Sequence, residues 1–142
     1  MRVKHVTMYY CDFCKKKLMV RPAMEKHEKH CTMNPNRACR MCAKIEADAA
    51  PLAELVAILP DPKDYMTEDE FGVSVGGTFG KDVDEAIPKL RAAADNCPMC
   101  MLAAIRQSGI NRWGWANFNF KAEVDSVWSE YNADEERRHM GY

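Results

Sequence analysis

The sequence predicts a mainly α-helical fold with small β elements, divided into two units at residues 1–35 and 36–142. Three observations predict it. Six of the seven cysteines form three Cys-x-x-Cys pairs, apolar residues recur at helical spacing along the second unit, and the two ends of the chain differ in charge. With 47% hydrophobic and 29% charged residues among 142, the composition is that of a folded globular chain.

The cysteine pairs are too numerous to be accidental, because random placement of seven cysteines gives only about 0.3 such pairs. The first residues lack the apolar core of a secretory signal, and the longest apolar stretch, Leu52–Leu59, contains Glu54 and is too short to cross a membrane. We therefore expect a cytoplasmic protein without a membrane segment. In that reducing compartment paired thiols usually bind a metal rather than form disulfides.

The N-terminal unit carries four metal-ligand side chains separated by two, twelve and three residues: Cys11, Cys14, His27 and Cys31. Two cysteines on a hairpin, together with a histidine and a cysteine four residues apart on a helix, can surround one ion. Three apolar residues supply a small core, namely Tyr9, Leu18 and Met24. His30 is an alternative fourth ligand, but we favour Cys31 because spacing of four is the commoner closing pair.

With these ligand and core positions, residues 9–31 resemble the C2H2 zinc-finger family in its C2HC variant, with Leu18 in place of the usual aromatic residue. The resemblance implies a ββα fold around one zinc ion. The family's base-contacting positions fall on Val20, Ala23 and Lys26, where direct readout needs Arg, Asn, Gln or Asp, and Val and Ala can contact only a thymine methyl. A single finger also covers only about three base pairs. Sequence-specific DNA recognition is therefore not expected. Basic residues of the unit can still contact phosphates or simply solvate its surface: Lys15, Lys16, Lys17, Arg21, Lys26 and Lys29.

The second unit contains several expected helices. Apolar spacing predicts helical structure over residues 43–59, which Pro51 divides or kinks. Alternation predicts a strand at Phe71–Val75 followed by a hairpin-type turn at Gly76-Gly77. A capping box formed by Asp82 and Glu85 predicts a helix that runs toward residue 95. Two more helices are predicted, one from Cys97 to a stop at Gly109 and one over residues 121–138.

The remaining cysteines form two pairs, Cys39/Cys42 and Cys97/Cys100, each at the start of a predicted helix. Four thiolates are the ligand set of a closed structural zinc site, and helix N-termini favour the ionised thiol. We therefore predict a four-cysteine site and two zinc ions per chain. Two alternatives remain: a binuclear or intermolecular arrangement, and a redox-active disulfide at Cys97-Pro98-Met99-Cys100.

An aromatic segment follows the third pair, Cys97/Cys100, and includes Trp113, Trp115 and Phe118. Bulky residues of this kind close the core of a small helical domain, and they also serve as anchors in protein–protein interfaces. We predict that most of the segment packs in the core. Its Trp113, Trp115 and Phe118 are candidate contacts to a protein partner.

The charges divide the chain into a basic head and an acidic body. Residues 1–42 carry 10 Lys+Arg against 3 Asp+Glu, whereas residues 43–142 carry 10 against 18. A basic head favours phosphate contacts, but the acidic body repels nucleic acid and attracts a basic protein.

No enzyme motif is complete. His27-Glu28-Lys29-His30 lacks the spacing of a zinc protease, and residues 31–138 contain no histidine. We therefore expect a non-enzymatic module that binds a protein partner, or alternatively nucleic acid through the basic finger. The block from His27 through Asn34-Pro35 to Cys42 also resembles small uncharacterised zinc proteins of bacteriophages and bacteria, which have no settled activity. With that resemblance, the function we expect is a phage-encoded regulator or inhibitor of a host complex, acting in the host cytoplasm.

Overall fold

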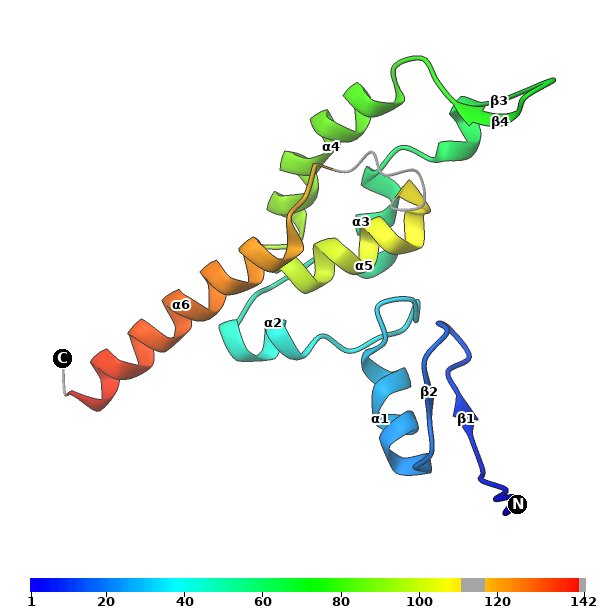
Figure 1. Cartoon of the computed structure of the whole chain (residues 1–142). Helices are drawn as coiled ribbons and strands as arrows, with labels where there is room; N and C mark the ends of the chain where they lie inside the picture. The colour runs from blue at the N-terminus through cyan, green and yellow to red at the C-terminus, as the bar shows by residue number, and fades with distance from the viewer. Residues whose placement is uncertain (111–116, 141–142) are drawn as a thin grey trace.

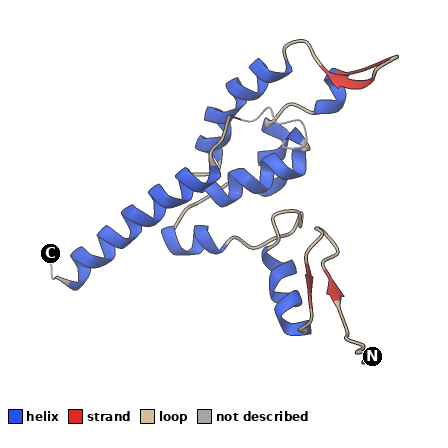
Figure 2. Ribbon diagram, in the orientation of Figure 1, coloured by secondary structure: helices blue, strands red, loops and turns tan. Residues whose placement is uncertain are grey.

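The computed structural model describes residues 1–110 and 117–140 of the chain. It is mainly helical, with two small antiparallel sheets of two strands each (Figure 1, Figure 2). In chain order the elements are β1 Tyr9–Tyr10, β2 Lys17–Leu18, α1 Arg21–His30, α2 Arg40–Ile45, α3 Leu52–Ile58, the 3₁₀ helix η1 Pro62–Tyr65, β3 Met66–Asp69, β4 Gly72–Val75, α4 Phe79–Ala93, α5 Pro98–Ser108 and α6 Phe120–His139.

The N-terminal elements are short and bury little. Strand β1 pairs with β2 so that Tyr9 lies opposite Leu18, and α1 packs against both strands. Met24 of α1 is the only buried apolar side chain here that is not a predicted metal ligand, within the described residues. The unit therefore has a very small core, although its order of two strands and a helix follows the predicted one.

The helical body is built around α5, which is buried along most of its length. Helices α3, α4 and α6 each contact α5. Met101, Ala104 and Ile105 of α5 meet Leu55 of α3 and Leu90 of α4 in one large apolar cluster. In contrast, α6 has no fully buried residue and extends away from the body at its C-terminal end (Figure 1). Its predicted apolar stripe nevertheless packs on the core through Val124, Val127 and Trp128.

Polar contacts join the two parts of the molecule. The Gln107 amide of α5 donates to the carbonyls of Thr32 (2.8 Å) and Asn34 (3.1 Å), and the Arg106 guanidinium donates to Thr32 Oγ1 (2.8 Å). Asn34 is buried and donates to the Glu28 carbonyl near the end of α1 (2.8 Å). These bonds hold the turn at Asn34-Pro35-Asn36 against the end of α5.

Several predicted elements of the body are confirmed. Two short helices, α2 and α3, occupy residues 40–58 on either side of Pro51, which is the N-cap of α3. Helix α5 ends at Gly109, whose φ of 84° lies in the left-handed region that favours glycine. The last helix, α6, covers the predicted range and one further residue at each end.

The predicted turn at Gly76-Gly77 was wrong. Strand β4 pairs with β3, which precedes it, so the tight turn lies at Glu70-Phe71. There the Phe71 N–H donates to Asp69 Oδ1 (2.9 Å), and Gly72 adopts a φ of 113° that other residues rarely reach. Gly76 and Gly77 instead lead from β4 into α4.

The predicted capping box at Asp82 was also wrong. Helix α4 begins at Phe79, with Thr78 as its N-cap. The Asp82 carboxylate lies inside the first turn, where it accepts hydrogen bonds from the Tyr65 hydroxyl (2.6 Å) and from Thr78 Oγ1 (3.0 Å).

Across the described residues, no helix combines the length and apolar character needed to cross a membrane.

Candidate metal centres

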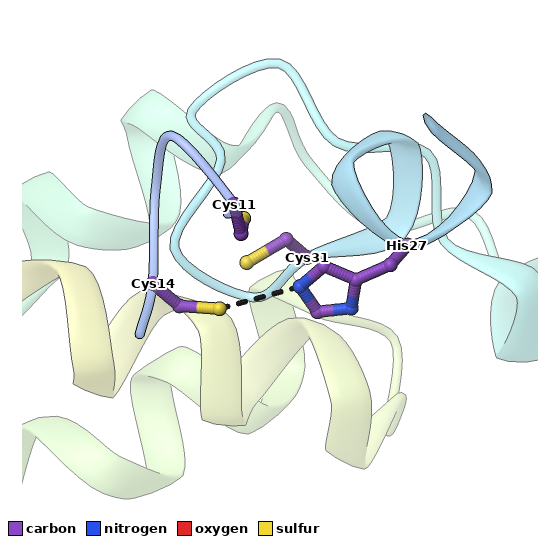
Figure 3. Close-up of side chains that lie close together, drawn as sticks. All are labelled: Cys11, Cys14, His27 and Cys31. Carbon is purple, nitrogen blue, oxygen red and sulfur yellow. Dashed lines mark hydrogen bonds between the residues drawn. The ribbon is translucent and has the colours of Figure 1, made fainter. Parts of the chain in front are cut away.

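The first cluster consists of Cys11, Cys14, His27 and Cys31, whose ligand atoms all lie within 4.8 Å of one another. Cys11 and Cys14 come from the loop between β1 and β2, and His27 and Cys31 come from the last turn and C-cap of α1 (Figure 3). The Cys14 sulfur lies 3.2 Å from His27 Nε2. Cys11 and Cys31 are buried, whereas Cys14 and His27 are half-buried.

The backbone of the loop is arranged around the two sulfurs. The Phe13 N–H donates to Cys11 Sγ and the Lys16 N–H donates to Cys14 Sγ, each at 3.4 Å. The Cys11 N–H donates to the Lys16 carbonyl (2.9 Å) and closes the loop. Because N–H donors stabilise negative charge on sulfur, this loop favours thiolates, the form that binds metal.

The ionisation of the first cluster suits a metal ion. Burial lowers the pKa of His27, and the Lys16 charge lowers it further, so the ring is neutral and able to bind a metal near pH 7. Burial opposes ionisation of Cys14, yet its pKa is lowered because the Lys16 N–H and neighbouring thiols donate to its sulfur. Burial raises the pKa of Cys31 to about 11. Thiols this close cannot all ionise unless a cation shares their charge.

The second cluster brings the distal pairs together in one chain: Cys39, Cys42, Cys97 and Cys100. The Cys39 and Cys97 sulfurs are 3.6 Å apart, and those of Cys42 and Cys100 are 3.3 Å apart. All seven cysteines of the chain are free, so neither pair forms a disulfide in this structure. Cys97 and Cys100 are buried within the core of the helical body.

Both pairs of this cluster stand at helix starts, as predicted. Cys39 is the N-cap of α2, and its sulfur accepts a hydrogen bond from the Cys42 N–H (3.4 Å). Cys97 is the N-cap of α5, where Pro98 occupies the first turn. The cluster thus fastens the short helix α2 to the central helix α5.

Ionisation is unequal within the second cluster. Hydrogen bonds from Cys100 and Cys97 lower the pKa of Cys39 far below its usual range. The same contacts raise the pKa of Cys100, and burial raises that of Cys42 to about 12. Without a cation the cluster can therefore carry little negative charge, and a divalent ion would stabilise the remaining thiolates.

The spacing of the ligand atoms fits a tetrahedral ion. Zinc–sulfur bonds of about 2.3 Å place two sulfurs about 3.8 Å apart, and a sulfur and an imidazole nitrogen about 3.6 Å apart. The distances of 3.2 to 3.6 Å in the two clusters are close to these values. Each cluster can therefore hold one metal ion.

His30, the alternative ligand, does not join the first cluster. Its Nδ1 donates to the Ala38 carbonyl (2.8 Å), on the chain that leads to α2. The structure instead brings the Cys31 sulfur to the other three ligand atoms.

The predicted phosphate-contacting residues are all exposed, and two of the six line one groove. Lys16 and Lys26 line a groove beside the first cluster, whereas Arg21 forms an ion pair with Glu25 (3.1 Å) on α1. Sequence reasoning missed Arg40 and Arg106, which line the same groove from the helical body. No local pattern marks these two arginines, because the fold alone brings them to the N-terminal unit.

Of the three candidate partner contacts in the aromatic segment, only Phe118 lies among the described residues. Trp113 and Trp115 lie outside the described residues. Phe118 is half-buried and packs against the main core. Sequence reasoning missed Phe71, whose side chain is 92% exposed at the tip of the β3–β4 hairpin.

Comparisons with known proteins found no match: no family model fits the chain, and no curated protein or solved structure is significantly similar to it. Function is therefore inferred from the two clusters and the exposed surfaces.

Proposed function

We propose that each cluster binds one Zn²⁺ as a structural site, and that the protein is a non-enzymatic module that binds a protein partner. The observation that carries the proposal is that each cluster presents four ligand atoms within 4.8 Å of one another. Four protein ligands complete the tetrahedron of zinc and leave no position for water or substrate. Zinc at such a site contributes folding energy rather than catalysis.

The ligand chemistry supports zinc in particular. Seven thiols and one imidazole suit a borderline-soft, tetrahedral ion, whereas magnesium and calcium prefer oxygen ligands. In the first cluster the set resembles the C2HC finger, which is the family we propose for residues 9–31.

The β3–β4 hairpin is the surface that best suits a protein partner. Phe71 at its tip is 92% exposed, and Val73 and Met66 are also exposed. Glu68 and Glu70 lie beside them and are exposed as well. An apolar tip with acidic neighbours is complementary to an apolar pocket with a basic rim.

The hairpin is fixed at its base, so its tip is presented in a defined position. The Tyr65 hydroxyl donates to Asp82 of α4 (2.6 Å), and the Tyr65 ring packs on Phe79 with centroids 5.1 Å apart. Val75 of β4 is buried in the core. Fixing the base lowers the conformational entropy that binding at the tip would cost.

The partner that this surface suits is a basic protein. In keeping with the phage-type block at residues 27–42, we propose a component of a host complex that the module regulates or inhibits. The acidic charge of residues 43–142 would speed such an encounter by long-range attraction.

Native mass spectrometry of the intact chain tests the metal assignment. We expect two zinc ions per chain at neutral pH, because both clusters are complete. A chain that carries one ion or none, or a different metal, would contradict it.

Capture from an extract of the native host tests the partner. Phe71→Ser removes the exposed ring, and Val20→Ser, at a residue 58% exposed on the N-terminal unit, is the matched control. We expect one protein to be retained by the parent chain and by the control but not by Phe71→Ser. Retention of nothing above background, or equal retention by all three chains, would refute the hairpin as the binding surface.

A further inference from the structure

A groove of about 550 Å³ runs between the N-terminal unit and the helical body. Lys16 and Lys26 line it from the N-terminal unit, while Arg40 of α2 and Arg106 of α5 line it from the helical body. No carboxylate is among its described lining residues. Four cations from two parts of the molecule therefore face one open space.

This groove differs in charge from three other hollows of the described surface. The groove between α2 and α6 includes Glu130, the pocket beside the second cluster includes Asp48, and the groove at the end of α3 includes Asp61. In the groove beside the first cluster, eleven of the twelve described lining residues lie in the basic residues 1–42, and Arg106 adds a cation from residues 43–142, which carry 18 Asp+Glu against 10 Lys+Arg.

The walls of the groove are held in place. Arg106 donates to Thr32 Oγ1 (2.8 Å), Gln107 donates to the Thr32 carbonyl (2.8 Å), and His30 donates to the Ala38 carbonyl (2.8 Å). These bonds cross from one unit to the other or to the segment that joins them. The cations consequently come from a preformed surface, which lowers the cost of ordering them around a ligand.

The metal centre in the groove wall does not cancel the positive charge. Three thiolates around Zn²⁺ carry a net charge of about −1, so with zinc as proposed above the four cations leave an excess of about three positive charges. The described lining contains no Trp, Tyr or Phe on which a base could stack and no Asn or Gln to read its edges. The chemistry of the lining suits phosphates rather than bases.

We propose that this junction groove binds the phosphodiester backbone of a nucleic-acid strand without sequence preference. An open groove with cations on both walls suits a chain of phosphates better than a single anion. The groove lies between the N-terminal unit and the helical body. The β3–β4 hairpin extends from the end of the body that faces away from the N-terminal unit (Figure 1). A protein partner and a nucleic acid could thus be held at once, so the inference goes beyond the proposed function.

Fluorescence anisotropy with the zinc-loaded full chain and a labelled, mixed-sequence 20-nucleotide single strand tests the proposal. If four phosphates are neutralised, the logarithm of affinity falls with the logarithm of salt concentration with a slope of about −2.8. Affinity should therefore fall about 50-fold between 50 and 200 mM salt. Absence of binding at 50 mM salt would overturn the proposal.

Paired variants locate the site. Lys26→Gln with Arg40→Gln removes two groove cations, and we expect the slope to fall to about −1.4 and affinity at 50 mM salt to fall at least about tenfold. Lys15→Gln with Lys17→Gln removes the same charge from exposed residues outside the groove and should change affinity less than about threefold. Zinc content and circular dichroism must match the parent chain in both. Equal weakening by the two pairs would refute the groove.

Inorganic pyrophosphate distinguishes a strand from a small anion. We expect it to displace the labelled strand only at concentrations at which it acts as added salt. Displacement at micromolar concentrations would show a small-anion site and overturn the assignment to a nucleic-acid backbone. Because Phe71→Ser leaves the groove untouched, it should bind the strand like the parent chain whether or not the hairpin binds a protein.

Discussion

The two metal clusters belong to regions that bury very different amounts of apolar surface. Around the first, the described core consists of Cys11, Met24 and Cys31, two of which are ligands themselves. Around the second, 16 buried residues form a continuous core that includes Cys97 and Cys100. A side chain of Leu or Phe size contributes about 1.5–3 kcal/mol when fully buried, so only the helical body has a substantial apolar contribution to its stability.

This difference indicates that the two four-ligand clusters have different roles in folding. In the N-terminal unit a bound metal would have to supply most of the folding energy, because one methionine cannot offset the entropy of ordering about 25 residues. In the helical body the second cluster instead attaches α2 to helices that already share a core. Three changes test this comparison.

The largest effect is expected from the second cluster. Cys97 is completely buried, so Cys97→Ser removes a ligand and also leaves a hydroxyl in the core. We expect the free energy of unfolding to fall by about 4 kcal/mol or more, with loss of most helical circular dichroism. Cys14→Ser, by contrast, should remove only the ordered signals of residues 9–31 in an NMR spectrum. Equal loss of helicity in both variants would show that the regions fold as one unit.

An intermediate effect is expected at Met24, which is 3% exposed. Met24→Ala should cost the N-terminal unit about 3 kcal/mol of packing. Because folding and metal binding are coupled there, the loss should appear as zinc affinity about 100-fold weaker in competition with a chelator. Leu55→Ala removes a similar volume from the helical body and should leave the affinity of the first cluster unchanged. If Leu55→Ala weakens zinc binding at both clusters alike, the two cores are not independent.

The ligand clusters were predictable from sequence because each rests on local spacing. Cys-x-x-Cys pairs place two sulfurs together whatever the rest of the chain does, and His27 and Cys31 share one helix face. Helices ended by Gly109 or interrupted by Pro51 were predictable for the same reason.

The features that the sequence did not predict depend on distant partners. Asp82 has the form of a helix cap, but the Tyr65 hydroxyl, 17 residues away, engages its carboxylate. The turn at Glu70-Phe71 was missed because Gly76-Gly77 is the stronger local signal. Arg106 reaches Thr32 across 74 residues of sequence, so the basic groove became visible only once the chain was folded.

The smallest effect concerns whether α6 belongs to the cooperative unit of the body. Arg91 of α4 donates two hydrogen bonds of 2.7 Å to Glu123 of α6, and this contact lowers the pKa of Glu123. Because the pair is about one-third exposed, Glu123→Gln should reduce the free energy of unfolding by only about 1 kcal/mol at pH 7.

A carboxyl whose pKa is lowered by folding contributes its full stability above its unfolded pKa of about 4.3 and loses it as pH falls through the folded-state value. Urea denaturation should therefore separate the variant from the parent chain at pH 7 and bring the two together as the pH falls below the folded-state pKa of Glu123. Glu136→Gln, on the exposed end of α6, is the control and should change little at either pH. If Glu123→Gln behaves like that control at pH 7, α6 frays independently of the body.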